Sequence, residues 1–585
     1  MNPAHRQAIT NIPHICAQHG VREVVISPGS RSAPLTVAFA RHPDLRCRVV
    51  FDERSAAYLA LGLAQQTGRP TALVCTSGTA ALNYAPAVAE AFYQGVPLLL
   101  FTADRPPEWI DQQDNQTLHQ SGLYEPHVRG SFQLPVDASH PDAAWQLTRL
   151  ISQAVNRSQH PLPGPVHVNV PLREPLYPEP GTPTRFQEVK RVAELAGEPL
   201  LTEAAWDALL AAWGEAPRKL LLAGQQPPDP ELLAALEALA LEPGVAVVGD
   251  LVANLFPEPG RGGPAIQQGD AVLLDRESAT RQALAPDLLV TWGGPLVSKG
   301  LKLFLRAQRP AAHWHVQPAG DAPDTFQALT QVVRMAPTRF FQELAARLSA
   351  QGEGRGDVGY GPAWRGLEAE ARQRAQGFLA GAPFSEFQAV ERVLWALPRG
   401  SHLQLGNSMP VRYANLIGRL PGMGFRRVDA NRGVSGIDGT VSTAVGAALA
   451  CQAAGTITTL LVGDLAFFYD RNGLWHDQLP ANLRIVLLNN HGGGIFRMIP
   501  GPSQLAPAET ERYFVTPQPL TARRTAEDHG CDYVRCRSAQ ELAAALPAFF
   551  QESDRPRILE IETDLEVNAR VYTQFKERLQ GLGQP

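Results

Sequence analysis

The sequence predicts an α/β fold built from three doubly wound parallel-sheet domains. Short apolar and β-branched runs end in turn residues, helical patterns separate these runs, and 585 residues are too many for one hydrophobic core. Near-continuous apolar strands that alternate with helices are typical of parallel sheets covered by helices. We expect three domains, at residues 1–180, 181–355 and 356–585.

The first domain shows five expected strands with helices between them. The strands lie at residues 21–29, 45–53, 70–78, 96–104 and 164–171. Segments 54–68 and 79–95 have the pattern of helices, and each ends in a glycine that suits a helix C-terminus. A segment rich in Pro, Gly and charge, residues 176–200, follows and is interpreted as a linker.

Two further α/β units follow the linker. Expected strands of the middle unit lie at 218–224, 244–250, 287–294 and 313–318, and a Gly-rich break at 350–361 precedes the last unit. Expected strands of that unit lie at 402–407, 425–431, 456–464, 484–490 and 557–563. Segments 76–104 and 435–464 share a Ser-Gly turn, a helix of small residues, an apolar strand and an Asp, which suggests two similar outer sheets.

Composition and charge argue against several classes of protein. The chain is 44% apolar and 19% charged, and its net charge of -5 argues against a general nucleic-acid or membrane-surface binder. No apolar run approaches about 20 residues, so no membrane span is expected. The N-terminus lacks the apolar core of a signal peptide. The six cysteines are scattered, which argues against a zinc site and favours a reduced, cytoplasmic setting.

Polar residues follow two strands of the last unit at the ends where open parallel sheets bind ligands. Asp464 ends the strand at 456–464, and Asn490 ends the next strand after one helix-length crossover. Together with the accessible carbonyl of Gly492, these oxygens suit an octahedral Mg²⁺ that also binds phosphate. His491 is interpreted as a bystander, because nitrogen ligands suit magnesium poorly. The alternative is that residues 489–494 only form a turn.

The spacing between Gly463-Asp464 and Asn489-Asn490 resembles the pattern of thiamine-diphosphate-dependent enzymes. In that family, a glutamate near the second strand of the N-terminal domain hydrogen-bonds a pyrimidine nitrogen of the cofactor, and Glu53 stands at the matching place. The resemblance implies that Glu53 is the catalytic acid, while the cofactor supplies the harder chemistry. Burial would favour the protonated form of the Glu53 carboxyl group. Taken alone, Glu53 would instead be an acid that interacts with a helix dipole.

Further segments carry a closer resemblance. They are SPGSRSAPL at 27–35, FDERSAA at 51–57, TSGTAALNYAPAVAEA at 76–91, TADRP at 102–106, GNS at 406–408, NRGVSGIDGTVSTA at 431–444 and GGGIF at 492–496. Together they resemble the thiamine-diphosphate synthases of menaquinone biosynthesis, which decarboxylate 2-oxoglutarate and add the resulting carbanion to isochorismate. The resemblance extends from about residue 20 to 515 and is loose in the middle domain.

The resemblance implies a role for each matching residue. Mg²⁺, for which Mn²⁺ can substitute, would be bound by Asp464, Asn490 and the carbonyl of Gly492. Thiamine diphosphate would also contact Ser408, Ser435, Gly436, Gly463 and Ile437, with Ile437 as the apolar wedge that bends it. An apolar wall beside the reacting centre would consist of Ile495, Phe496 and Ile499. The remaining substrate contacts would come from Ser30, Arg31, Arg105, Gln116, Lys299, Arg412 and Arg432.

Charge complementarity independently supports the substrate-binding arginines. 2-Oxoglutarate and isochorismate each carry two carboxylates, which guanidinium groups bind bidentately. Arg31, Arg105 and Arg432 each stand in a loop at a strand end, although Arg105 could instead form a structural ion pair with Asp104.

The middle domain departs from the family pattern. That pattern has two adjacent basic residues, whereas here Lys299 is followed by Gly300. Lys302 is a candidate replacement.

Two alternatives stay open at this point. An acetolactate synthase-like enzyme or a simple 2-oxoacid decarboxylase would use the same cofactor on small monocarboxylates and would not need the three arginines. A non-catalytic scaffold is the other, and the intact Glu53, Asp464 and Asn490 argue against it. Because different sheets bind the two ends of the cofactor, the resemblance implies a site between subunits of a homodimer or homotetramer.

Overall fold

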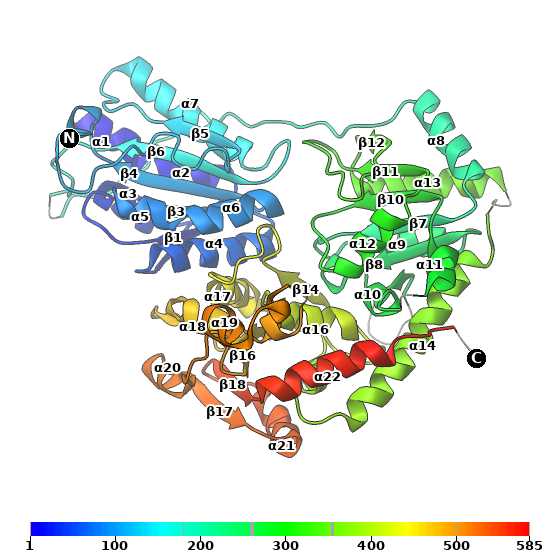
Figure 1. Ribbon diagram of the computed structural model, residues 1–585. Helices are drawn as coiled ribbons and strands as arrows, with labels where there is room; N and C mark the ends of the chain where they lie inside the picture. Colours follow the sequence, from blue (N-terminus) through cyan, green and yellow to red (C-terminus); the bar gives the residue numbers. More distant parts are fainter. Residues whose placement is uncertain are drawn as a thin grey trace.

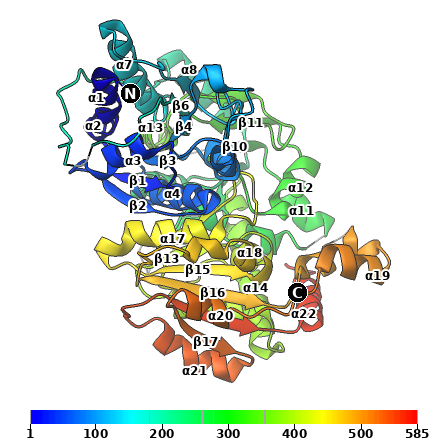
Figure 2. The ribbon, with the colours of Figure 1, turned by 90° about the vertical axis from the view of Figure 1, so that its left-hand side faces the viewer.

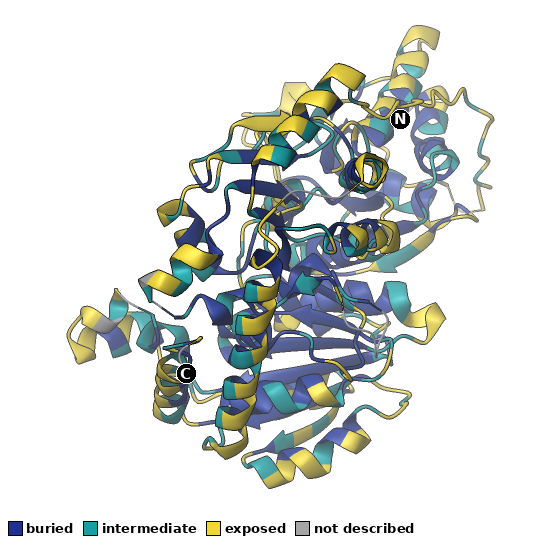
Figure 3. Cartoon of the chain, turned by 90° about the vertical axis from the view of Figure 1, so that its right-hand side faces the viewer, coloured by how far each residue is buried: buried dark blue, intermediate teal, exposed yellow. Residues whose placement is uncertain are grey.

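Three six-stranded sheets, each with parallel strand pairs throughout, organise the described part of the chain (Figure 1). The computed structural model describes residues 2–179, 181–257, 263–275, 277–352, 356–499 and 501–583. Helices flank the sheets, whose strands form buried layers beneath helices with exposed outer faces (Figure 3). This architecture confirms the predicted fold class.

The N-terminal sheet has the strand order β2-β1-β3-β4-β6-β5. Its strands are β1 (Glu23–Ile26), β2 (Arg46–Val49), β3 (Thr71–Cys75), β4 (Leu98–Asp104), β5 (Gly130–Gln133) and β6 (Pro165–Pro171). Its helices are α1 (Pro3–Thr10), α2 (Ile12–Gln18), α3 (Ala33–Ala40), α4 (Glu53–Thr67), α5 (Thr79–Asn83), α6 (Ala85–Gln94) and α7 (Pro141–Arg157).

The C-terminal sheet repeats this order as β14-β13-β15-β16-β18-β17, so the predicted similarity of the outer sheets extends to their topology. Its strands are β13 (His402–Leu405), β14 (Arg427–Ala430), β15 (Thr458–Gly463), β16 (Leu483–Asn489), β17 (Asp532–Cys536) and β18 (Arg557–Glu562). Its helices are α15 (Glu386–Ala396), α16 (Met409–Ile417), α17 (Thr440–Cys451), α18 (Asp464–Tyr469), α19 (Pro507–Thr510), α20 (Arg523–Asp528), α21 (Ala539–Phe549) and α22 (Leu565–Arg578). Helix α14 (Tyr360–Gly381) precedes them and packs against both the middle and the C-terminal domain.

The middle sheet has a different order, β12-β11-β10-β7-β8-β9. Its strands are β7 (Lys219–Ala223), β8 (Val245–Gly249), β9 (Ala265–Ile266), β10 (Leu288–Trp292), β11 (Ala312–Val316) and β12 (Gln331–Val333). Its helices are α8 (Glu203–Glu215), α9 (Pro230–Leu239), α10 (Gly269–Val272), α11 (Ser278–Leu284), α12 (Lys299–Ala307) and α13 (Pro337–Gln351).

Strands β5, β9, β12 and β17 are absent from the sequence prediction, and each lies at an edge of its sheet. β5 and β12 are largely exposed or half-buried, β9 has two residues, and β17 alternates exposed and half-buried positions before a single buried residue at its end. An edge strand is covered on fewer sides than a central one, so it does not need a continuous apolar run.

The single helix predicted over residues 79–95 is wrong, because the chain forms α5 and α6 there with a break at Tyr84. Pro86 stands in the first turn of α6, where its missing N–H costs no hydrogen bond, whereas it would disrupt a continuous helix. Helix α4 does end at Gly68, which adopts a left-handed φ of 65°.

Residues 182–202 form no helix or strand, as expected for the linker, and Figure 1 shows this segment crossing from the N-terminal sheet towards α8. Its first part is fastened to the N-terminal domain, because the ring of Phe186 packs against His14 and His42. The expected domain boundary at 180 and residues 353–355 of the second break lie outside the described residues.

Helices α4 and α17 pack against each other between the two outer sheets (Figure 2). A β-carbon added to Gly62 would lie 2.1 Å from the carbonyl oxygen of Thr443, and one added to Gly446 would lie 2.0 Å from that of Leu59. The two glycines therefore allow the helix backbones to touch. Since α4 begins at Glu53 and α17 follows the loop with Ser435 and Gly436, this contact positions both predicted cofactor-binding segments.

We expect Gly446→Ala to lower the free energy of unfolding by about 1–3 kcal/mol, because the added methyl group overlaps backbone atoms that cannot move independently. Denaturant unfolding measures the change. Gly366→Ala is the matched control: it lies in α14 with no atom within 4 Å of the added carbon, so it should raise stability by about 1 kcal/mol. Equal effects of the two substitutions would contradict this account of the contact.

Among the described residues, no helix has both the length and the apolar character needed to cross a membrane.

Candidate cofactor and substrate site

A cavity of about 160 Å³ lies at the carboxyl ends of β15 and β16, which are hydrogen-bonded neighbours. Several of the predicted site residues line it, namely Ser408, Ile437, Gly463, Asp464, Asn490, Gly492, Ile495 and Phe496. Ile499 is not among the lining residues, but its N–H donates to the carbonyl of Ile495 (3.1 Å), so it belongs to the same turn. The two strand ends thus lie side by side, as their spacing predicts.

The polar atoms of this cavity have the chemistry of a hard-cation site. The buried carboxylate of Asp464 accepts hydrogen bonds from the Leu465 N–H and the Gln518 amide, both at 2.8 Å, and burial raises its pKa. The amide oxygen of Asn490 accepts from the Gly492 N–H at 3.1 Å. A carboxylate, an amide oxygen and the neighbouring Gly492 carbonyl fit magnesium. Among the described residues, no cluster of three or more His, Cys, Asp and Glu offers an alternative metal site.

Glu386 is a cavity residue that the sequence analysis missed. Its buried carboxylate accepts a hydrogen bond from Asn490 Nδ2 at 2.7 Å, which fixes the orientation of the Asn490 amide in the cavity wall. Burial and the nearby charge of Asp464 raise the pKa of Glu386 to about 7. In the sequence it is one more acid in the first turn of a helix, a common feature that carries no functional signal.

The loop between β14 and α17 carries Ser435, Gly436 and Ile437. The side-chain amide of Asn407 connects two parts of this loop, because it donates to the carbonyl oxygens of Asn431 (2.7 Å) and Gly436 (2.6 Å). Ser408 and Ser435 both adopt left-handed backbone angles, with φ of 73° and 69°. Serine rarely adopts such angles, and they cluster at functional sites.

Glu53 does not line the cavity in this chain. It is half-buried at the N-terminus of α4, and together with burial its charge raises the pKa of the Cys75 thiol. The residues beside it contact the segment after α18: Arg54 donates to the carbonyl of Tyr469, and Asn472 donates to Asp52. A large aromatic surface lies nearby, where the rings of Phe51 and Trp475 stack while each is half exposed.

Arg31 and Arg105 form a pair of cations at the N-terminal sheet. The buried Arg31 donates to the carbonyl of Leu172 (3.0 Å), and its pKa is lowered by burial and by the charge of Arg105. Arg105 forms its ion pair with Asp114 (3.2 Å) rather than with Asp104, which accepts from the Arg105 backbone N–H.

The other predicted residues of this group lie on the loops around the arginines. Ser30 Oγ accepts a hydrogen bond from the Tyr177 hydroxyl at 3.2 Å. Gln116 lies against Gly78 and adopts a left-handed φ of 55°. These residues and the two arginines form the first polar group of the candidate substrate site.

A second group of cations lies where the middle and C-terminal domains meet. Arg412 and Arg432 are largely buried and close enough for the charge of Arg412, after burial, to lower the pKa of Arg432. Lys302 belongs to this group, since burial and the charges of Arg432 and Arg412 lower its pKa. Lys299 is exposed at the start of α12.

The geometry also explains the departure at Gly300. The carboxylate of Asp270 accepts hydrogen bonds from the Gly300 N–H (3.0 Å) and from the Ser298 hydroxyl (2.6 Å). A β-carbon at Gly300 would lie 2.6 Å from the same carboxylate oxygen, so no larger residue fits there without moving Asp270. The ammonium group of Lys302, also in α12, donates to the carbonyl of Leu296 (2.9 Å) and lies near enough to Arg432 and Arg412 for their charges to lower its pKa.

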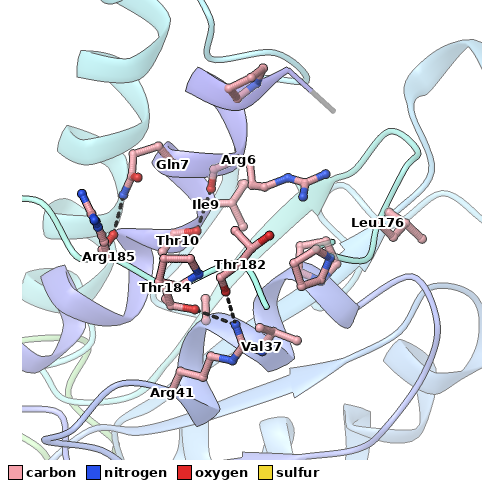
Figure 4. A pocket seen from close by; sticks show the side chains of 15 residues that line it. Arg6, Gln7, Ile9, Thr10, Val37, Arg41, Leu176, Thr182, Thr184 and Arg185 are labelled. Carbon is pink, nitrogen blue, oxygen red and sulfur yellow. Dashed lines mark hydrogen bonds between the residues drawn. The ribbon is translucent and has the colours of Figure 1, made fainter. Parts of the chain in front are cut away.

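A separate cavity of about 210 Å³ lies between α1, α3 and segment 176–185 (Figure 4). None of the predicted site residues lines it. Arg6, Arg41 and Arg185 lie around it, and the guanidinium of Arg41 donates to Thr182 and Thr184. Figure 4 shows the three guanidinium groups pointing in different directions, so they do not form a common anion site.

Comparisons with known proteins now bear on this geometry. Two family models match, "Thiamine pyrophosphate enzyme, N-terminal TPP binding domain" over residues 8–123 and "Thiamine pyrophosphate enzyme, C-terminal TPP binding domain" over residues 423–561. A protein of Cytophaga hutchinsonii named 2-succinyl-5-enolpyruvyl-6-hydroxy-3-cyclohexene-1-carboxylate synthase is 42% identical over 98% of this chain and 99% of its own length. The chain belongs to this synthase family.

Relatives of the same name in Porphyromonas gingivalis and Desulfotalea psychrophila are 38% and 40% identical, over 99% and 96% of this chain and 98% of their own lengths. The chain is therefore a thiamine-diphosphate-dependent transferase of the synthase family. The relatives do not favour the acetolactate synthase-like, decarboxylase or scaffold alternatives.

Proposed function

We propose that this enzyme decarboxylates 2-oxoglutarate and adds the resulting four-carbon unit to isochorismate, a step of menaquinone biosynthesis in the cytoplasm. The observation that carries the proposal is the combination of the cavity that Asp464, Asn490 and Gly492 line with two separate groups of buried or half-buried cations. Four substrate carboxylates need such groups, whereas a small monocarboxylate does not.

The cofactor end of the site follows from the cavity. Asp464, Asn490 and the Gly492 carbonyl would bind Mg²⁺ or Mn²⁺, while Ser408, Ser435, Gly436 and Gly463 would hold the diphosphate. Thiamine diphosphate, when bound, would supply the nucleophilic carbon and the electron sink that decarboxylation of a 2-oxo acid requires. Glu53 would hold a proton at the pyrimidine nitrogen, and Ile437 would press the two rings of the cofactor together.

The substrate end uses charge and the exclusion of water. Arg412, Arg432 and Lys302 would bind carboxylates from one side, and Ser30, Arg31, Arg105 and Gln116 from another. Ile495, Phe496 and Ile499 would exclude water from the reacting centre while isochorismate binds as the acceptor.

We also propose that the working enzyme is a homodimer or a homotetramer, with each site shared between two chains. Glu53 is outside the cavity of its own chain, so a second copy is needed to bring an N-terminal domain to the C-terminal cavity. The exposed aromatic rings of Phe51, Tyr469 and Trp475 beside Glu53 supply the apolar surface that such a contact would bury.

Lys302→Ala should raise KM for one substrate by about tenfold, because it removes a cation that faces Arg412 and Arg432. Lys299→Ala is the matched comparison, and its effect should be smaller, since Lys299 is exposed. Steady-state kinetics with each substrate varied in turn distinguishes them. A larger effect at Lys299 would reassign the middle-domain contact to that residue.

Mass-spectrometric identification of the product tests the proposed function. Enzyme, thiamine diphosphate and Mg²⁺ are incubated with 2-oxoglutarate or pyruvate, each with and without isochorismate. The expected outcome is a joined product only when 2-oxoglutarate and isochorismate are both present. Turnover of pyruvate alone would overturn the proposal in favour of a decarboxylase or an acetolactate synthase-like activity.

A further inference from the structure

We propose that Glu90, on helix α6 of the N-terminal domain, is a positioning residue for the loop at residues 431–439 of the same chain. This inference rests on the proposed function, because that loop carries Arg432, proposed to bind substrate, and Ser435 and Gly436, proposed to bind cofactor. Glu90 contacts neither ligand in this proposal and acts through the loop alone.

The carboxylate of Glu90 is surrounded by donors from the loop. It accepts hydrogen bonds from three consecutive backbone N–H groups, those of Gly433 (2.6 Å), Val434 (2.7 Å) and Ser435 (3.3 Å). The side chain of Gln94 donates to it at 2.5 Å. Successive N–H groups that converge on one point form an anion-binding concavity. Here the anion is a side chain of another domain, only 1% exposed.

The loop cannot keep this shape by local preference alone. Ser435 has a left-handed φ of 69°, which a serine adopts only when its surroundings impose it. Gly433 has no room for a side chain, since a β-carbon would lie 2.7 Å from the Glu90 carbonyl oxygen and 3.1 Å from its carboxylate. Contact with Glu90 therefore selects both the residue at 433 and the backbone conformation at 435.

The position of Arg432 depends on the same anchor. Arg432 directly precedes the three N–H groups, and its Nη1 donates to Asn407 Oδ1 at 3.0 Å. Asn407 in turn donates to the carbonyl oxygen of Gly436, so the guanidinium and the far side of the loop share one support. A shift of residues 433–435 would move the guanidinium and the Ser435–Gly436 segment together.

The end of the loop is also held by the N-terminal domain, but more weakly. The hydroxyl of Tyr58, on α4, donates to the carboxylate of Asp438 at 3.0 Å. Tyr58→Phe removes this one hydrogen bond and keeps the ring that packs on Gly439. It provides a graded comparison for the loss of the three bonds to Glu90.

The test compares Glu90→Gln and Glu90→Asp with Tyr58→Phe in the full-length enzyme. Glu215→Gln, an exposed acid at the end of α8, is the control. Glu90→Gln keeps the side-chain volume but replaces one carboxylate oxygen, which accepts from backbone N–H groups, with an NH₂ donor. Glu90→Asp keeps the negative charge but shortens the side chain, so the carboxylate lies farther from the loop. Three quantities are measured: amide hydrogen exchange of the peptide covering 431–439, the dissociation constant of thiamine diphosphate with Mg²⁺, and the steady-state constants.

In the absence of cofactor and substrate, we expect amide hydrogen exchange of the peptide covering 431–439 to be faster in both Glu90 variants than in the wild type. Substrate KM and the cofactor dissociation constant should each rise roughly tenfold or more, because charge-assisted hydrogen bonds are lost. The decrease in kcat should be smaller, Tyr58→Phe should give smaller changes of the same sign, and Glu215→Gln should match the wild type.

Two results would overturn the proposal: unchanged exchange at 431–439 in the Glu90 variants, or increased exchange with unchanged cofactor affinity and KM, which would make Glu90 a structural contact only. If the wild-type enzyme does not join 2-oxoglutarate to isochorismate, the proposed function fails by itself. Hydrogen exchange and cofactor affinity then still decide the role of Glu90.

Discussion

Glu53→Gln should lower turnover by about 10²- to 10⁴-fold and leave magnesium-dependent binding of thiamine diphosphate close to the wild-type value. Glutamine can still form a hydrogen bond at the start of α4, but it cannot hold and exchange the acidic proton that activates the cofactor. The proposed metal and diphosphate contacts lie in the C-terminal cavity, which does not include Glu53. Steady-state turnover and titration of the cofactor by calorimetry measure the two quantities separately.

Glu203→Gln is the matched control for this substitution. Glu203, like Glu53, is the first residue of a helix and follows an N-cap side chain, Thr202 in one case and Asp52 in the other. Loss of a favourable helix-dipole interaction is therefore common to both variants. Glu203→Gln also weakens the exposed ion pair of Glu203 with Arg347, so the control carries at least the structural cost of Glu53→Gln. Unchanged turnover in Glu53→Gln, or equal losses in the two variants, would remove Glu53 from the mechanism.

Asp464→Asn should abolish most of the Mg²⁺-dependent cofactor affinity, with a rise in the dissociation constant of about 100-fold or more. The substitution preserves size, and the new amide oxygen can still accept from the Leu465 N–H, so the fold should remain intact. It removes the negative charge proposed to face the metal. A ligand present at about 100 times its dissociation constant stabilises a protein by about 2.7 kcal/mol, so the variant should lose that stabilisation.

Thermal unfolding with and without cofactor and Mg²⁺ checks this expectation. Asp477→Asn, a change at an exposed acid outside the cavity, is the control and should keep the full ligand-dependent shift. A wild-type shift in Asp464→Asn would show that the cation is held elsewhere, and the magnesium assignment would then be wrong.

The central strands and the cavity loops could be predicted because their sequences are constrained by burial on both faces and by polar residues at strand ends. β16 is buried throughout and β15 is buried up to its last residue, and Asp464 and Asn490 stand immediately beyond them. Four of the six edge strands, β5, β9, β12 and β17, could not be predicted, because they are short or only partly buried. The other two, β2 and β14, lie within the strands predicted at 45–53 and 425–431.

Glu386 and Glu90 were missed for a different reason. Each lies in a helix where an acid is ordinary, and its partner lies 104 residues away for Asn490 and 343 residues away for Gly433. Their significance comes from tertiary contacts, which a single sequence does not display. The presence of glycine at position 300 is similarly explained only by a tertiary contact, because the carboxylate of Asp270 lies against it.

The glycine-mediated contact of α4 with α17 has a consequence for how this family can diverge. A bulkier residue at Gly62 or Gly446 could be tolerated only if one helix slid or tilted against the other. Glu53 is the first residue of α4, and residues 431–439 directly precede α17. Such a displacement would therefore move both away from their proposed positions in the site. Selection on catalysis should thus preserve small side chains along this seam even where the fold alone would accept larger ones.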